Sequence, residues 1–442
     1  MGRNVALTYR DGKEVITALL LALSTAGLVS RASAAPLPRP YYVDRYDLKL
    51  VPDPENQRIS GEVAIHFNTT GGQLYLVELD AGPTIEISDV LEGKVKQKFE
   101  RQDGLLFVKL LRPAVPKDPR TLTIHYEAGP AKGLKFFPDQ IYSEFFTSDW
   151  MVCNERPENR ATLRLRIAPK EGWRATASGE PAGAAEWRID TPLPAFLYGF
   201  AVGQFQETAD APGAVPGLRL LGGPDLAKSG SAIIEATRAA LQFFADKTGK
   251  VYPAPAYTQV FTHGSPMQEN ANFTLLPEAY ANIIKTEPEA LGLLAHELAH
   301  QWYAVRIQCL DWSDFWLNEG MATFLADAFL ERRFGRERYE REIERSRGIY
   351  EGLKGQGKDR ALSFHAWNTP DEASGEIPYH KGAYVLDLLR REMGEDKFWQ
   401  GLRLYTRDNW NKAATSQDFQ KAMESAAGKN LAAFFDEWVS KP

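Results

Sequence analysis

The chain has 442 residues, a formal net charge of -6 and a pI near 5.8. Its 44% hydrophobic and 25% charged residues are typical of a folded protein, and the length allows two or three domains. No stripe of clustered Lys and Arg is present, which argues against a nucleic-acid partner. Cys153 and Cys309 are too few for a disulfide framework, so we expect buried thiols and leave their pairing open.

The N-terminal segment, residues 1–34, has the layout of a signal peptide. Basic residues precede an apolar run at 15–29, and Ala32, Ser33 and Ala34 follow it. The alternative is a membrane anchor, but this run is shorter than the ~20 residues that a spanning helix needs. We therefore expect cleavage after Ala34 and export to the periplasm or the extracellular space. We expect no stable membrane span in the mature protein, and the sequence does not give its oligomeric state.

The next segment, residues 38–207, has the pattern of an antiparallel β domain. Apolar residues alternate with polar ones, as at Tyr46, Leu48 and Leu50, and turn-forming stretches separate the runs. From residue 208 to 442 helical periodicity and good helix formers prevail. The sequence thus predicts an α+β multidomain fold, with a β domain at 38–207 and a mainly helical domain at 208–442.

One predicted helix in the second domain carries the stretch HELAH at residues 296–300. It is expected to open with Thr286 and Glu289 at the spacing of a capping box. On a helix, His296 and His300 project from one face to the same point, while Glu297 points about 100° away. Such a pair suits a zinc ion, with the glutamate as general base. The alternative is an ordinary amphipathic face, because so short a pattern arises by chance.

The residues downstream decide between these two alternatives. A zinc site in a hydrolase usually takes two His, one carboxylate and a water, so a third ligand is needed. Glu319 opens a second helical run that reaches Phe334 and ends at Gly335, and two neighbouring helices can share one metal. We therefore expect one Zn²⁺ per chain, held by His296, His300 and Glu319.

The stretch HELAHQW at 296–302, followed by WLNEG at 316–320, resembles the gluzincin zinc metallopeptidase family of aminopeptidase N and leukotriene-A hydrolase. The resemblance implies a saddle-like N-terminal β domain and a thermolysin-like catalytic domain, in a short form that ends after the catalytic domain. It also assigns residues outside the zinc motif. Residues 266–270, PMQEN, are similar to a family motif that binds substrate, and 379–382, YHKG, are similar to the motif of the catalytic tyrosine.

The resemblance implies that Glu269 holds the substrate's α-amine, with Met267, Gln268 and Asn270 beside it, and that Tyr379 stabilises the oxyanion. The expected function is a zinc aminopeptidase that acts on peptides by metal-activated water attack, with Glu297 as general base. A zinc endopeptidase or another zinc hydrolase on the same scaffold is the first alternative. A binding module without catalysis is the second.

Three positions depart from the family pattern. Pro266 replaces a Gly and cannot donate a backbone hydrogen bond, and Gln268 replaces a Met, which predicts a more polar pocket for the first residue. Ala326 stands where many members have a Glu, and Asp327 follows it, so the support of the metal ligands is in question. The histidines outside the motif are expected to be structural or surface groups: His66, His125, His263, His365 and His380.

Overall fold

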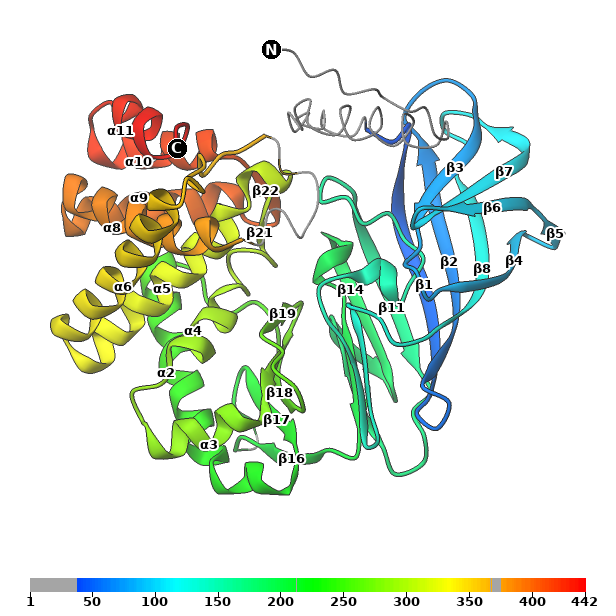
Figure 1. The fold of residues 1–442 in the computed structure, drawn as a ribbon, viewed down its shortest axis with the longest axis horizontal. Helices are drawn as coiled ribbons and strands as arrows, with labels where there is room; N and C mark the ends of the chain where they lie inside the picture. Colours follow the sequence, from blue (N-terminus) through cyan, green and yellow to red (C-terminus); the bar gives the residue numbers. More distant parts are fainter. Residues whose placement is uncertain (1–37, 212, 366, 368–374) are drawn as a thin grey trace, which may run out of the picture.

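The computed structural model describes residues 38–211, 213–365, 367 and 375–442, in two parts that lie side by side (Figure 1). Strands form the N-terminal part, whereas helices dominate the C-terminal part around a five-stranded sheet. This confirms the predicted α+β fold class. The predicted signal peptide, 1–34, lies outside the described residues, and export therefore stays a prediction.

The main sheet of the N-terminal part has eight strands in the order β13-β14-β11-β1-β2-β8-β4-β5. Side chains along each strand alternate between the two faces, so Tyr46, Leu48 and Leu50 are buried while Asp47 and Lys49 are more exposed. The pairing of β1 with β11 is parallel, unlike its antiparallel pairing with β2, so the sheet is mixed. The strands are β1 (Tyr41–Asp53), β2 (Arg58–Thr69), β4 (Glu86–Glu92), β5 (Val95–Lys96), β8 (Arg120–Ala128), β11 (Arg160–Ile167), β13 (Glu180–Gly183) and β14 (Glu186–Pro194).

Two smaller sheets complete this part. The first has the order β3-β7-β6, with β3 (Leu74–Asp80), β6 (Lys98–Gln102) and β7 (Leu105–Ala114). The second has the order β12-β15-β10-β9, with β9 (Leu134–Phe137), β10 (Gln140–Ser143), β12 (Arg174–Ala177) and β15 (Phe200–Gly203). Tyr142 and Ala201 of the second sheet pack against Val260 and Leu275 of the C-terminal part. This apolar contact joins the two parts of the molecule.

The sheet of the C-terminal part has five strands in the order β16-β17-β18-β20-β19. They are β16 (Gln206–Ala209), β17 (Gly217–Gly222), β18 (Ala256–Thr262), β19 (Gln268–Asn270) and β20 (Phe273–Pro277). The predicted domain boundary after residue 207 falls inside β16, which pairs with β17, and that boundary stays a prediction. The edge strand β19 carries Glu269 and contacts the helix of the HELAH stretch.

Helices cover the rest of the C-terminal part (Figure 1). They are α2 (Gly230–Thr248), α3 (Glu278–Thr286), α4 (Gly292–Ala299), α5 (Trp316–Phe334), α6 (Arg336–Gly355), α8 (Gly382–Met393), α9 (Glu395–Asn409), α10 (Ser416–Ala427) and α11 (Ala432–Trp438). A π-helical turn, η5 (Ile377–Lys381), precedes α8, and β21 (Ile307–Cys309) pairs with β22 (Lys412–Ala414).

The start of α4 differs from the sequence prediction. Thr286 ends α3, where its hydroxyl donates to the carbonyl of Asn282 at 3.2 Å, and α4 begins at Gly292. Pro288 disfavours helical geometry at the residue before it, and Glu287 has φ -126° and ψ 80°. The chain therefore leaves α3 and turns before the next helix begins. The predicted end of α5 is confirmed, because Gly335 follows its last residue with φ 92°.

The two cysteines and the question of a membrane span were also raised by the sequence. Cys153 and Cys309 are both buried and free, so they do not form a disulfide bond with each other. Within the described residues, no helix has the length and apolar character needed to cross a membrane.

Candidate metal centre

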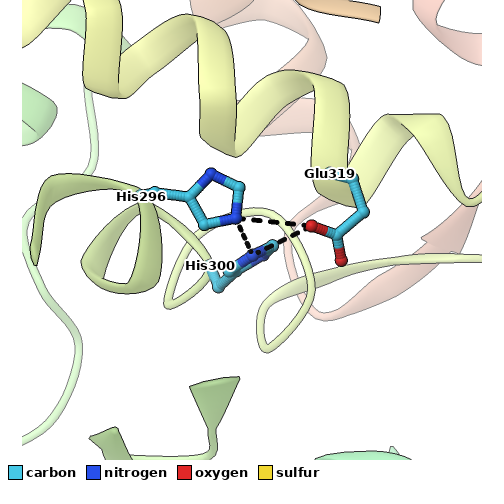
Figure 2. A group of neighbouring side chains, drawn as sticks. All are labelled: His296, His300 and Glu319. Atoms are coloured by element: carbon cyan, nitrogen blue, oxygen red, sulfur yellow. Dashed lines mark hydrogen bonds and ion pairs between the residues drawn. The ribbon is translucent and has the colours of Figure 1, made fainter. Parts of the chain in front are cut away.

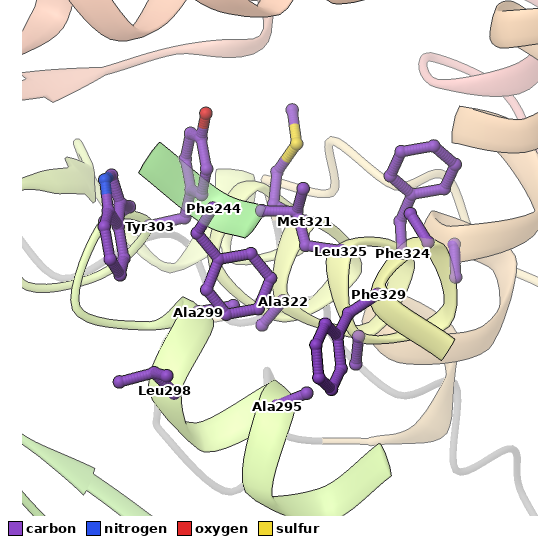
Figure 3. Packing of buried hydrophobic residues seen from close by; sticks show 14 of the residues in the cluster. Phe244, Ala295, Leu298, Ala299, Tyr303, Met321, Ala322, Phe324, Leu325 and Phe329 are labelled. Carbon is purple, nitrogen blue, oxygen red and sulfur yellow. The ribbon is translucent and has the colours of Figure 1, made fainter. Parts of the chain in front are cut away.

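The close packing of α4 on α5 positions the predicted ligands (Figure 3). Ala295 and Ala299 of α4 are fully buried, as is Leu298, and they face a cluster that includes Ala322 and Leu325 of α5. Small alanines at such a crossing let two helix axes approach closely. His296 and His300 each follow one of these alanines by one residue, about 100° around the helix, and they lie beside Glu319 in the first turn of α5.

The structure brings His296, His300 and Glu319 together (Figure 2). The two Nε2 atoms are 3.1 Å apart, and Oε2 of Glu319 is 3.4 Å from each of them. In a tetrahedral zinc site, metal–ligand bonds near 2.0 Å place neighbouring ligand atoms about 3.3 Å apart. The three atoms converge at the separations that a shared zinc ion requires.

The other ring nitrogens fix how the imidazoles present themselves. Nδ1–H of His300 donates to the carbonyl of Tyr303 at 3.1 Å, which leaves Nε2 as the atom with a free lone pair. Nδ1 of His296 lies 3.3 Å from the hydroxyl of Thr323. Thr323 stands one turn after Glu319 on α5 and supports this ligand, although no carboxylate occupies position 326. Sequence reasoning missed Thr323, and its only signal was the i, i+4 spacing from Glu319.

These contacts test whether zinc fits the site. Two imidazoles whose Nε2 atoms converge on one point and one carboxylate match the donor set of a hydrolytic zinc site, and outer hydrogen bonds orient both rings. His296, His300 and Glu319 would hold the ion. Two nitrogen donors and one oxygen donor favour zinc over magnesium or calcium, which prefer oxygen ligands.

Two further carboxylates flank the cluster. Glu297 and Glu269 form a second close group with His300, with one ligand atom of each within 4.8 Å of the others. Glu297 is 3% exposed and Glu269 is 5% exposed. Oε2 of Glu297 and Oε1 of Glu269 are buried and have no hydrogen-bond partner among the described residues. Each therefore offers an oxygen to a ligand.

The four residues of the PMQEN motif that were predicted to bind substrate have different surroundings. Met267 is 60% exposed and lines the same cavity as Glu269. The side chain of Gln268 is used inside the protein: its Oε1 accepts from the backbone N–H of Phe145 at 2.7 Å, and its Nε2 donates to Oε2 of Glu269 at 2.7 Å. Asn270 is buried, with its amide against Gly199. In this structure Gln268 thus orients Glu269 and does not line the pocket.

Hydrogen bonds of Gln301 connect β19 and the turn after it with the C-terminal end of α4. Gln301 directly follows His300; its Nε2 donates to the carbonyl of Asn270 at 2.9 Å, and its Oε1 accepts from the N–H of Asn272 at 3.0 Å. The side chain of Gln301 is 1% exposed. The strand that carries Glu269 and the helix that carries the histidines are therefore fixed to each other.

Tyr379 reaches the cluster from η5. Its ring stacks on His296, with centroids 5.9 Å apart and planes 17° from parallel. This approach depends on two glycines, because a Cβ on Gly382 would lie 2.8 Å from the Cα of Gly320. The turn that carries Tyr379 thus crosses the helix that carries Glu319 at a contact between backbones.

The electrostatics of the group reflect burial and mutual repulsion of the acids. Burial, together with Glu319, raises the pKa of Glu269 to about 7 against the opposing effect of His300. Burial and the neighbouring carboxylates raise the pKa of Glu297 well above its usual value. Burial alone would also raise the pKa of Glu319, but His300 and His296 outweigh it and lower that pKa to about 2. A bound dication favours the charged form of every acid here.

The cluster opens into a cavity of about 660 Å³. Its wall includes Glu269, Glu297 and Tyr379, and it continues along α5 to Asp327 and Leu330. His380 also faces the cavity, and its Nδ1 lies 3.2 Å from the hydroxyl of Ser346. The size is sufficient for a short peptide or a drug-sized molecule.

A helix with two histidines, followed by a helix with a glutamate and packed beside a mixed sheet, defines the class of gluzincin metallopeptidases. Residues 233–438 match the model of the peptidase family M1 domain. Residues 233–438 therefore form a domain of this family of metallopeptidases. The predicted family is thereby confirmed.

Relatives and solved structures agree with this assignment. The chain is 24% identical to probable aminopeptidase 1 of Sulfurisphaera tokodaii over 90% of its length, and 23% identical to glutamyl aminopeptidase of Bos taurus over 90%. It spans about half of these relatives, 53% and 46%. Yeast LTA4 hydrolase has a similar fold, with a TM-score of 0.77 and 19% identity over 91% of this chain and 68% of that one. An M1 zinc metallopeptidase from Deinococcus radiodurans also has a similar fold, with a TM-score of 0.72 and 21% identity over 91% of this chain and 94% of that one.

Proposed function

We propose that the protein is a zinc-dependent aminopeptidase that removes the N-terminal residue of peptides. The observation that supports this most directly is Glu269, a buried carboxylate beside the metal cluster with one oxygen left without a partner among the described residues. An ammonium group is the natural partner for such an oxygen, because a charge-assisted hydrogen bond offsets the cost of burial. An endopeptidase has no need of this feature.

The residues of the chain divide the chemistry among themselves. Zinc, when bound, supplies a Lewis acid that polarises a carbonyl group and lowers the pKa of water. Glu297 takes the proton of the attacking water and delivers it to the leaving amine. The Tyr379 hydroxyl donates a hydrogen bond to the oxygen of the scissile carbonyl as negative charge develops on it. Glu269 holds the α-amine, so that the first peptide bond lies over the cluster.

The comparisons are consistent with this function. The curated relatives quoted above are named aminopeptidases, and a solved M1 zinc metallopeptidase from Deinococcus radiodurans was crystallised with the substrate Tyr-Ser-Ala. Peptides with a free N-terminus are therefore the substrates that we propose for this chain.

The test compares hydrolysis of free and N-acetylated aminoacyl substrates by the wild type and by Glu297→Gln, with the zinc content of both proteins measured. We expect the wild type to bind zinc and to cleave only the free substrates, and the variant to keep zinc but lose turnover. Equal cleavage of acetylated substrates would indicate an endopeptidase or another hydrolase. Absence of tightly bound zinc would favour a binding module.

A further inference from the structure

The cavity extends well beyond the metal cluster on the side of α5 and α6. After Glu319, the α5 residues that line it are Thr323, Ala326, Asp327 and Leu330. Asp327 follows Glu319 by eight residues, which corresponds to ~12 Å along a helix. Glu269 stands on β19, beside the cluster itself. The cavity thus has an end that is remote from the residue proposed to hold the α-amine.

Asp327 is an unusual side chain in the wall of this end. It is 6% exposed, and its Oδ2 is buried without a hydrogen-bond partner among the described residues. Burial raises the pKa of Asp327 well above its usual value, and Glu342 adds to the effect. Buried carboxylates are normally paired, because an uncompensated buried charge costs several kcal/mol. Asp327 and its neighbour Ala326 both line the cavity.

The nearby cations are already engaged with other acids. In Arg338 of α6, Nη2 lies 2.8 Å from Oε1 of Glu342 and Nη1 lies 3.7 Å from Oε2 of Glu289. Nη1 of Arg345 lies 3.8 Å from Oε2 of Glu342. Ion pairs of Asp327 within 4.0 Å are absent from the described part of the chain. Neither of these guanidinium groups forms an ion pair with Asp327, although both line the same wall.

We propose that Asp327 makes this end of the cavity a subsite for a cationic side chain, Lys or Arg, on the second residue of the peptide. The proposal rests on the proposed function, because the register of the peptide follows from the α-amine at Glu269. With that amine held and the first peptide bond over the cluster, the second residue lies on the far side of the scissile bond. An extended chain advances only ~3.5 Å per residue, so a long side chain is needed to approach Asp327.

The expected pairing is a charge-assisted hydrogen bond in a site of low dielectric constant. The aliphatic stem of the Lys or Arg side chain would lie along Leu330 and Leu293, which line the same cavity. Hydrogen bonds to charged groups contribute about 1.5–3 kcal/mol, so the preference for Lys over Met at the second residue should be roughly tenfold or more in kcat/KM.

The experiment measures kcat/KM for tripeptides that share a first residue and differ only in a second residue of Lys, Met or Glu. Wild type should favour Lys over Met by roughly tenfold and disfavour Glu. Asp327→Asn should bring the Lys-to-Met ratio close to one, while hydrolysis of an aminoacyl anilide, which has no second residue, stays unchanged. Glu340→Gln on the exposed face of α6 removes the same charge outside the cavity and should keep the wild-type ratio.

A Lys-to-Met ratio near one in wild type, or a ratio that survives Asp327→Asn, would overturn the proposal. Calorimetric binding of the Lys and Met tripeptides to zinc-loaded Glu297→Gln protein, with and without Asp327→Asn, needs no turnover. If the wild type hydrolyses nothing yet the Lys tripeptide binds about tenfold tighter in a manner that depends on Asp327, the subsite stands and the proposed aminopeptidase activity fails. Equal binding of both tripeptides in that case refutes the subsite as well.

Discussion

Single side chains around the ligands decide how well the site is held. Thr323 contacts Nδ1 of His296 and is the hydrogen-bonding side chain that the structure shows there. Such outer contacts commonly change metal affinity by 10- to 100-fold. We expect Thr323→Val to weaken zinc binding by about tenfold, measured by competition with a chromogenic chelator. Thr323→Ser should retain the affinity of the wild type. Unchanged affinity in the valine variant would remove Thr323 from the support of the metal.

Gln268 makes a second prediction about a single side chain. Because its amide holds one oxygen of Glu269, Gln268→Met should let that carboxylate move, and KM for free aminoacyl substrates should rise several-fold with a smaller change in kcat. The effect should vanish when Glu269→Gln is already present, since the amide would act through the carboxylate. Steady-state kinetics on the four proteins of this cycle give the coupling energy. Independent, additive effects of the two substitutions would contradict the assigned role.

At the scale of elements, the crossing of α5 with the turn before α8 places Tyr379. Gly382→Ala forces a Cβ into the backbone of Gly320 and should displace Tyr379 from His296. Misplacement of a catalytic group by about 1 Å can cost 10²-fold in rate, so kcat should fall by roughly that factor with zinc content preserved. Gly348→Ala in α6, where a Cβ meets nothing within 4 Å, is the matched control and should leave kcat unchanged.

The elements also show what the sequence could and could not predict. The HELAH spacing is local, so the side on which His296 and His300 stand follows from helical geometry alone. The end of α5 was likewise predictable, because Gly335 adopts a positive φ that favours glycine. The glycine crossing and the contact of Thr323 with His296 depend on how two helices meet, which no local pattern specifies. The hydrogen bond between Phe145 and Gln268 was not predictable either, since the two residues lie 123 positions apart in the sequence.

At the scale of the whole molecule, stability should depend on the pH through Glu155 in the N-terminal part. Burial, reinforced by Asp80, raises the pKa of Glu155 from 4.5 to about 7, although Ser148 donates two hydrogen bonds to it. The folded protein therefore binds this proton more tightly than the unfolded chain. The resulting stabilisation is complete below pH 4.5 and is lost as the pH rises to about 7.

Glu155→Gln should flatten this dependence. The free energy of unfolding of the wild type, measured by urea titration at several pH values between 5 and 7.5, should fall by on the order of 1–3 kcal/mol more than that of the variant. Glu158→Gln, at an exposed position of the same segment, is the control and should follow the wild type. Parallel curves for the wild type and Glu155→Gln would show that Glu155 titrates alike in the folded and unfolded states.

The hydrogen bonds of Gln301 have a consequence for the products of the reaction. They hold β19, with Glu269, at a set distance from the helix that carries His300. For cleavage at the second peptide bond, Glu269 and the amine that it holds would have to lie one residue, ~3.5 Å, farther from the cluster. The buried hydrogen bonds of Gln301 do not allow this movement. The aminopeptidase that we propose should therefore shorten a peptide by one amino acid per cycle, and free dipeptides should not accumulate at any stage of a digestion.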